Sequence, residues 1–277
     1  MKTLYTFGAE RVERNLTVAD ILAAKGNRVL TETTATSAEA AAAAADAGID
    51  MLVGPAVLQA DMREGAPHVF TTIGVKVTAF ASADAVLGEA YRVMEAGADA
   101  VYCPREPRIV EHLAAASIPV MSHVGLVPRT STWIGGLRAY GRTAEEALEL
   151  YQTIKDLENA GAVMAEVEVV AADALSAIAP LTKMSMISLG SGPGGDVQYL
   201  FQEDAVGETP NPPRHARAFG DITPHVAAIE EERRRALRAF RDATQSGSYP
   251  AAQESVRMKE GEKDRFHNAL AKASKQV

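Results

Sequence analysis

The same short junction recurs between helical and β-prone segments of this sequence. Residues 47–50, 96–99 and 160–162 each place a glycine after an alanine-rich helical stretch and just before an apolar run. Glycine adopts the left-handed conformation that closes a helix at little steric cost, so each junction predicts a helix end followed by a strand. Repeated alternation of this kind is typical of βαβ units and a parallel sheet.

Eight candidate strands can be counted around these junctions. They lie at residues 28–31, 51–53, 75–79, 100–102, 119–123, 162–168, 186–190 and 198–201. Helical stretches lie at residues 37–47, 83–96, 108–116, 143–159 and 171–179. Hydrophobic residues make up 47% of the chain and aromatic residues only 5%, which suits a core of aliphatic side chains. We therefore predict an α/β protein with a (β/α)8 TIM barrel, which 277 residues can form as one domain.

The pattern changes in the C-terminal part of the chain. A proline-rich turn at residues 210–213 precedes a long helical stretch at residues 224–244, and the motif SGSYP at residues 246–250 precedes a charged, helical segment. We predict a barrel catalytic domain at residues 1–250 and a C-terminal helical tail at residues 251–277. This extension either covers the barrel or contacts a neighbouring subunit, and both alternatives stay open.

The charge and the cysteine content exclude several classes of protein. The formal net charge is −8 and the basic residues are dispersed, apart from three arginines at residues 233–235, so we expect no nucleic-acid partner. The chain has no run of about 18 apolar residues and no signal-peptide pattern, which predicts no membrane partner and a cytoplasmic protein. Cys103 is the single cysteine, so it forms no intrachain disulfide, and a reactive thiol there would require a lowered pKa.

In a parallel barrel, the working residues lie at the carboxyl ends of the strands and in the loops that follow. His123 ends the strand at residues 119–123 and precedes a long glycine-containing loop, so it can reach the barrel mouth. It is either a substrate contact or a hydrogen-bonded structural histidine. Glu166 and Glu168 end the strand at residues 162–168, and strand alternation sends both carboxylates to the same side. Such a carboxylate could remove a proton next to a carbonyl group, or the pair could form salt bridges.

A glycine-rich turn follows the strand at residues 186–190. From Gly190 through Ser191 to Asp196, the turn can expose backbone N–H groups that hold an anion such as a carboxylate. The turn matches neither the dinucleotide-binding fingerprint nor the Walker lysine pattern. It is therefore a candidate site for the acidic group of a substrate, with a plain turn as the alternative.

In their order along most of the chain, these segments resemble the ketopantoate hydroxymethyltransferase family of the phosphoenolpyruvate mutase and isocitrate lyase superfamily. IPVMSHVGLVP at residues 118–128 is similar to the family's IPVxGHIGLTP segment, and GSGP at residues 190–193 is similar to its GAGP. SGSYP at residues 246–250 is similar to the family's SGSFP, and LTVAD at residues 16–20 to its opening. Glu168 falls on the family's general-base glutamate, in a segment similar to GAFAVVLE.

The resemblance implies an activity, co-substrates and an assembly. It implies a homo-oligomer, commonly a decamer, that transfers a hydroxymethyl unit from methylenetetrahydrofolate to a small enolised 2-oxo acid held on Mg²⁺, as in pantothenate biosynthesis. It implies Glu168 as the catalytic base. We assign substrate binding to His123, Gly190, Ser191 and Tyr102, the last of which stands where the family has a lysine.

The departures from the family pattern fall on its metal site. VGPA at residues 53–56 replaces VGDSLG, and VTA at residues 77–79 replaces the aspartate-bearing VAD. YCP at residues 102–104 replaces the KLE of AVKLEGG. Mg²⁺ prefers oxygen ligands that include carboxylates, which proline and alanine side chains cannot supply. The acids that could rebuild a metal site are Glu32, Glu106 and Glu166.

Three functions remain open. The first is the family's hydroxymethyl transfer. The second is a related carbon–carbon bond lyase or aldolase that acts on another small oxo acid, with or without Mg²⁺, because the loops after three strands are remodelled. The third is a non-catalytic relative that keeps the barrel for binding or assembly. Turnover of any substrate would remove the third, and turnover insensitive to EDTA would favour the second over the first.

Overall fold

A computed structural model describes residues 1–76 and 78–274. The described chain forms two compact units, which divide between Gly220 and Asp221. This division precedes the domain boundary predicted at residue 250, so the assignment of residues 221–250 to the catalytic domain stays a prediction. Within the described ranges, no helix has the length and apolar character needed to cross a membrane.

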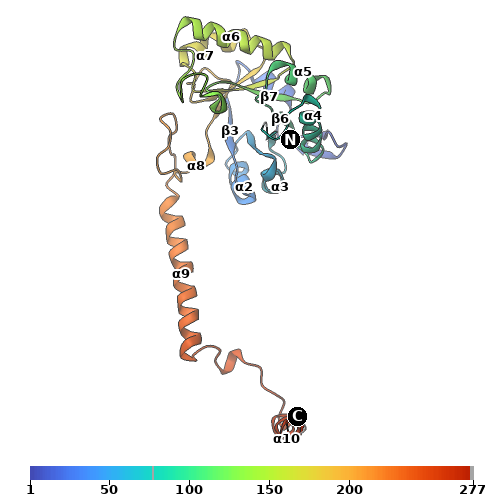
Figure 1. Ribbon diagram of the computed structural model, residues 1–277, viewed down its shortest axis with the longest axis vertical. Helices are drawn as coiled ribbons and strands as arrows, with labels where there is room; N and C mark the ends of the chain where they lie inside the picture. Colours follow the sequence, from blue (N-terminus) through green and yellow to red (C-terminus); the bar gives the residue numbers. More distant parts are fainter. Residues whose placement is uncertain (77, 275–277) are drawn as a thin grey trace. The chain divides into compact units, whose positions relative to one another are not determined.

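The first unit contains a closed barrel of eight parallel strands (Figure 1). In chain order the strands are β3 (Leu30–Thr34), β4 (Met51–Pro55), β5 (Phe70–Gly74), β6 (Ala100–Tyr102), β7 (Val120–Gly125), β8 (Met164–Glu168), β9 (Ser185–Leu189) and β10 (Val197–Tyr199). Each strand pairs with the next, and β10 pairs with β3 to close the barrel. The predicted (β/α)8 barrel is confirmed.

Helices alternate with these strands. They are α1 (Val18–Ala24), α2 (Ala38–Asp46), α3 (Gln59–Gly65), α4 (Ala83–Glu95), α5 (Pro107–Ala115), α6 (Ala144–Asn159), α7 (Ala172–Ile178) and α8 (Gln202–Ala205). At the start of α2 and α6, the hydroxyls of Ser37 and Thr143 accept backbone N–H groups of the first turn. The junction glycines Gly48, Gly97 and Gly161 all have positive φ, as the sequence predicts.

The prediction is wrong for the third strand. The structure places this strand at Phe70–Gly74, whereas the sequence pattern predicts residues 75–79, of which Val77 lies outside the described residues. Both runs are rich in β-branched residues, so propensity does not separate them. Pairing with β4 decides which run forms the strand, because it aligns Phe70 with Met51. Helix α3, which the sequence analysis does not anticipate, returns the chain to that position.

Side chains of the strands alternate between the inside of the barrel and the layer beneath the helices. The inside is packed with large apolar side chains, and Ile21 of α1 packs against them. The residues of this inner core are Ile21, Leu30, Met51, Val53, Phe70, Ala100, Met121, Met164, Ile187, Leu189, Val197 and Tyr199. A second core, rich in alanine and valine, lies between barrel and helices.

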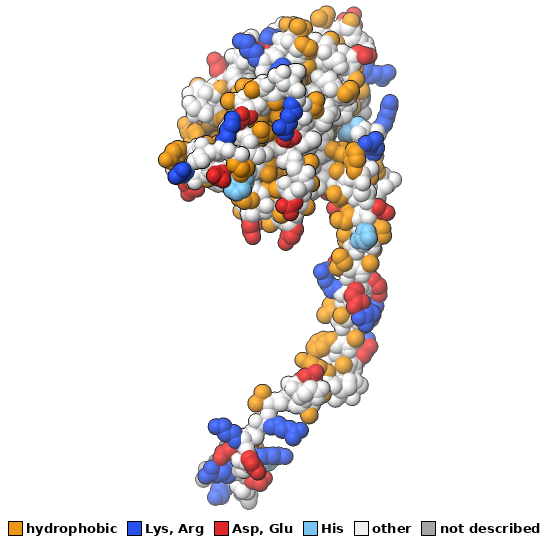
Figure 2. All heavy atoms as spheres, turned by 180° about the vertical axis from the view of Figure 1, so that it is seen from behind, with side chains coloured by type: hydrophobic (Ala, Val, Ile, Leu, Met, Phe, Trp, Pro, Cys, Tyr) orange, Lys and Arg blue, Asp and Glu red, His pale blue; other side chains and the backbone are white. Residues whose placement is uncertain are grey.

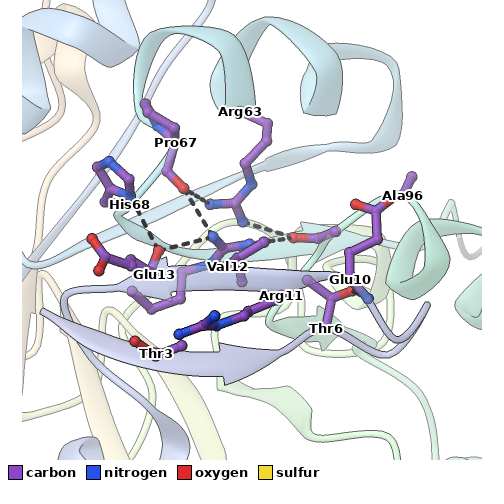
Figure 3. A pocket seen from close by; sticks show the side chains of 12 residues that line it. Thr3, Thr6, Glu10, Arg11, Val12, Glu13, Arg63, Pro67, His68 and Ala96 are labelled. Carbon is purple, nitrogen blue, oxygen red and sulfur yellow. Dashed lines mark hydrogen bonds between the residues drawn. The ribbon is translucent and has the colours of Figure 1, made fainter.

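A hairpin of β1 (Lys2–Tyr5) and β2 (Arg11–Arg14) contacts the loops that precede β5 and β6, at the end of the barrel where strands begin. Arg14 and Arg63 both pair with Asp99, at 2.8 and 3.0 Å. Figure 3 shows Arg63 and His68 reaching toward this hairpin. The hairpin is not among the predicted strands.

The second unit contains α9 (Thr223–Ser246), the short turn η4 (Ala252–Glu254) and α10 (Glu262–Ala273). Helix α9 matches the helical stretch predicted at residues 224–244. Neither α9 nor α10 has a buried residue. Figure 2 shows charged and hydrophobic side chains together on the surface of this unit.

Candidate active site

Several polar side chains point into the barrel at or near the carboxyl ends of its strands. Their direction follows from alternation, because Met164 lies in the inner core and Glu166 and Glu168 follow it at two-residue steps. They include Glu32 on β3, Tyr102 on β6, His123 on β7, Glu166 and Glu168 on β8, and Tyr199 on β10. The strand register aligns His123 with Glu166, and Tyr199 with Glu32.

His123 lies at the centre of this group. Its Nε2 atom lies 3.1 Å from Glu168 Oε2 and 3.7 Å from Glu166 Oε1, and its side chain is 4% exposed. These contacts lack hydrogen-bond geometry, so Nε2 has no hydrogen-bond partner among the described residues. Its Nδ1 atom shares a 2.6 Å hydrogen bond with the Tyr102 hydroxyl. Both His123 and Tyr102 lie at the mouth of the barrel, and their substrate contacts stay predictions.

The hydroxyl of Tyr102 fixes the ring of His123. Burial raises the pKa of this phenol above its ordinary value, and the nearby carboxylates Glu166 and Glu168 raise it further. The hydroxyl therefore keeps its proton near neutral pH. It can donate to Nδ1, or accept a proton from it, so the histidine can present either an N–H or a lone pair at Nε2.

Two acidic groups of the mouth, Glu166 and Glu32, have perturbed pKa values. Burial raises the pKa of Glu166 to about 7; neighbouring His123 lowers it and Glu168 raises it. Burial raises the pKa of Glu32 well above its ordinary value, and the charge of Glu166 raises it further. Both carboxylate oxygens of Glu32 lack a hydrogen-bond partner within the described residues. Strongly perturbed, buried acids of this kind cluster at functional sites.

A cavity of about 900 Å³ opens above this group. The polar atoms of His123, Glu166 and Glu168 lie at one side of it, and most of its remaining lining is apolar, as in Val57, Phe80 and other side chains. Pockets of this size accept small organic molecules. The arrangement offers a hydrocarbon surface for an alkyl group beside carboxylates that can accept or donate a proton.

Gly190 and Ser191 lie away from this cavity. The Ser191 hydroxyl donates to the carbonyl of Val167 at 2.7 Å and accepts the N–H of Val170 at 2.8 Å. Gly190 has a φ of +69°, and a Cβ atom there would lie 2.6 Å from the ring of His215. Gly190 lines a separate cavity of about 660 Å³. Both residues therefore stabilise the turn, Ser191 through its hydrogen bonds and Gly190 through close packing against His215. Their substrate roles stay predictions.

The three predicted metal candidates occupy different surroundings. Glu32 and Glu166 are buried inside the barrel. Glu106 is partly exposed and pairs with Arg105 and Arg108 at 3.2 and 3.0 Å. Its own backbone N–H and these arginines lower its carboxyl pKa to about 2. Glu106 does not line the mouth cavity, so the structure groups Glu166 with His123 and Glu168 instead.

The positions at which the resemblance places the Mg²⁺ ligands do not fit that ion. Pro55, Ala79 and Pro104 line the mouth cavity and have hydrocarbon side chains. Val77, in the same replaced segment, lies outside the described residues. Because Mg²⁺ requires oxygen ligands in near-octahedral geometry, the family's metal site is absent from its expected place on the described residues.

Tyr199 and Arg129 also line the mouth cavity and were not singled out by the sequence analysis. Tyr199 ends the last strand, which the sequence marks only weakly. Its position at a strand end is the sequence feature that identifies it as a candidate site residue. Arg129 lies in the loop after β7, and nothing in its local sequence distinguishes it from other surface arginines.

Comparison with known proteins identifies sequence relatives. A family model described as ketopantoate hydroxymethyltransferase matches residues 56–252. The 3-methyl-2-oxobutanoate hydroxymethyltransferase of Pyrobaculum islandicum is 32% identical over 263 residues, which cover 86% of this chain and 97% of that protein. The protein of the same name from Cenarchaeum symbiosum is 35% identical over 187 residues, covering 66% and 68% of the two chains.

Solved structures share the fold at low sequence identity. A 2,3-dimethylmalate lyase of the PEP mutase/isocitrate lyase superfamily superposes with a TM-score of 0.51 and 12% identity, covering 92% of this chain and 99% of that chain. A phosphonopyruvate hydrolase in complex with oxalate and Mg²⁺ has a TM-score of 0.50 and 15% identity, with the same coverage. These likenesses support the barrel fold and carry no statement about the reaction.

Proposed function

The chain belongs to the ketopantoate hydroxymethyltransferase family, and from that premise we propose that it transfers a hydroxymethyl unit from methylenetetrahydrofolate to a small 2-oxo acid. The observation that carries the proposal is the position of Glu168. Its carboxylate ends β8 inside the mouth cavity, 3.1 Å from His123 Nε2. Homo-oligomeric assembly and a cytoplasmic location remain predictions of the sequence.

The cavity supports binding of a short, branched oxo acid. Its apolar lining can pack against an alkyl group, while Arg129 brings a positive charge to the same cavity. We assign the substrate carboxylate to Arg129, because a guanidinium binds a carboxylate in a planar, two-point contact. The carbon to be deprotonated then lies between the apolar wall and Glu168.

In the first chemical step, Glu168 accepts the proton from the carbon next to the carbonyl group. The C–H electron pair forms the enolate double bond, and the negative charge moves to the carbonyl oxygen. Glu166, whose pKa is about 7, can donate a hydrogen bond to that oxygen in its protonated form. Pro55, Ala79 and Pro104 offer no side-chain oxygen to Mg²⁺, so the residues that act in this step are Glu168 and Glu166.

The second step forms the carbon–carbon bond. Water adds to the methylene carbon of methylenetetrahydrofolate, and cleavage of both C–N bonds releases formaldehyde while the two nitrogens of tetrahydrofolate take up the protons. The enolate carbon then attacks the formaldehyde carbon, and the resulting alkoxide takes the proton held by Glu168 to give the hydroxymethyl group. One oxo acid, one methylenetetrahydrofolate and one water thus give one hydroxymethylated oxo acid and one tetrahydrofolate. The residues named here deprotonate and orient the oxo acid.

Deuterium exchange tests the first step without the folate. We expect purified protein in D₂O and EDTA to exchange the C3 proton of 3-methyl-2-oxobutanoate, as followed by proton NMR. The variant Glu168→Gln should lower the exchange rate roughly 10²- to 10⁴-fold, the usual contribution of a general base. Glu106→Gln is the matched control and should exchange at the parent rate. Unchanged exchange in Glu168→Gln would refute the assignment of the base.

A related carbon–carbon bond enzyme is the second candidate. The observation that favours it is the hydrocarbon lining at Pro55, Ala79 and Pro104, where the family has substrate and metal contacts. Adding methylenetetrahydrofolate to the exchange assay separates the two functions. Formation of the hydroxymethylated acid supports the transferase, and exchange without transfer supports the second candidate. Absence of both reactions supports a non-catalytic relative.

A further inference from the structure

Glu32, Glu166 and Glu168 lie together at the mouth of the barrel, and His123 is the basic side chain that lies against two of them. Within residues 1–76 and 78–274, none of Glu32, Glu166 and Glu168 forms an ion pair with lysine or arginine. Glu32 is 2% exposed and Glu166 is 6% exposed. Burying carboxylates together without a lysine or arginine partner is costly, so such a group attracts a cation strongly.

The spacing of three donor atoms suits one bound ion. His123 Nε2 and one oxygen each from Glu166 and Glu168 lie within 4.8 Å of one another. Ligands at about 2.0–2.2 Å from a transition metal lie about 3.0–3.4 Å apart. The distance of 3.1 Å from His123 Nε2 to Glu168 already lies in that range, and the distance of 3.7 Å to Glu166 needs only a small side-chain rotation to reach it.

Two neighbours complete the surroundings of a metal site. Tyr102 holds His123 through Nδ1, as the outer partner of a metal-binding histidine commonly does, and this leaves Nε2 free to face an ion. Glu32 points into the barrel from β3 with both oxygens unpartnered among the described residues. It is close enough to Glu166 for the two charges to interact.

We propose that His123, Glu166 and Glu168 bind a first-row divalent transition metal ion such as Mn²⁺, Fe²⁺, Co²⁺ or Zn²⁺. Tyr102 orients the histidine and Glu32 adds negative charge. An imidazole donor selects such ions over Mg²⁺, which takes oxygen ligands. The site is distinct from the positions replaced at Pro55, Ala79 and Pro104.

This inference goes beyond the proposed function and has a consequence for it. Glu168 cannot coordinate an ion and accept a proton through the same lone pair. Occupancy of the site and proton abstraction therefore compete, and a transition metal acts as an inhibitor of the exchange reaction.

Cobalt titration of the full, metal-stripped chain tests the site without any turnover. We expect one Co²⁺ per chain, with visible absorption bands from the nitrogen and oxygen ligands, and weaker binding of Mg²⁺ in parallel calorimetry. Glu166→Gln and Glu168→Gln should each weaken Co²⁺ binding more than Tyr102→Phe, for which roughly 10- to 100-fold is expected. Glu106→Gln should bind as the parent does. Thermal unfolding of each variant verifies that it is folded.

The outcomes separate this proposal from the proposed function. Absence of Co²⁺ binding, or equal binding by the parent, Glu166→Gln and Glu168→Gln, would overturn the metal site. The exchange assay in EDTA reports on the base independently. Slower exchange on adding Co²⁺, restored by EDTA, supports the competition. Faster exchange on adding Co²⁺ would show that Glu168 is not the base in the loaded protein and would overturn the competition.

Discussion

The two ends of the barrel bury charge in opposite ways. At the end where strands begin, Asp99 receives Arg14, Arg63 and the backbone N–H of Thr71, so its carboxylate is well compensated. At the mouth, buried carboxylates face one another, and Glu32 has no hydrogen-bond partner among the described residues. The first arrangement stabilises the fold. The second costs stability, which indicates that the mouth is kept for binding and chemistry.

Removing Asp99, at the end of the barrel where strands begin, should have the largest effect on stability. Asp99→Asn leaves two buried guanidinium groups without their carboxylate, which is expected to cost about 3–5 kcal/mol of unfolding free energy. Urea unfolding followed by circular dichroism measures this loss. Asp84→Asn, at a side chain that is 91% exposed, is the control and should change stability little. A loss as small as the control's would mean that the Asp99 network does not stabilise the fold.

Removing an acid at the mouth should raise the free energy of unfolding, whereas removing Asp99 lowers it. Burial and Glu166 raise the pKa of Glu32, so its native form holds a proton more tightly than the unfolded chain. Its contribution to stability is therefore fully present below the ordinary glutamate pKa and is lost as the pH rises toward the folded value. Glu32→Gln removes this loss and should stabilise the metal-stripped protein by about 1–3 kcal/mol at pH 8.

The comparison between pH 5 and pH 8 sharpens this test. The gain in unfolding free energy for Glu32→Gln should be larger at pH 8 than at pH 5, as measured by urea unfolding in EDTA. Destabilisation by Glu32→Gln at both pH values would mean that the carboxylate has a partner in the folded protein, and the contrast between the two ends would fail.

The smallest effect concerns Cys103, which follows β6 at the mouth but faces the helices and not the inside of the barrel. Cys103 packs in the second core, between barrel and helices, and burial raises the pKa of its thiol to about 12. Only about 10⁻⁴ of the native thiol is ionised at pH 8, so a disulfide reagent should react far more slowly with native than with urea-unfolded protein. Rapid reaction of the native protein would place Cys103 among the reactive groups of the mouth.

Local pattern was enough to predict much of the site. Period-two alternation on the strand before Glu168 shows that Glu166 and Glu168 share a face, and the position of His123 at a strand end predicts that it reaches the mouth. Local pattern does not show what packs against Gly190 and Ser191, because the direction of a turn depends on its neighbours in the fold; their substrate roles stay predictions. There the ring of His215 and the backbone around Val170 take up the space.

The sequence by itself determined the alternation of strands and helices, the glycine junctions, the family and the loss of its metal-binding acids. These properties depend on the period of apolar residues and on residue identity, both of which are local. Only the tertiary structure decided that β5 begins at Phe70 and that Glu32 lies near Glu166. Barrel closure between β10 and β3 brings these distant strands together, so the perturbed acids of the mouth arise from contacts that no local pattern encodes.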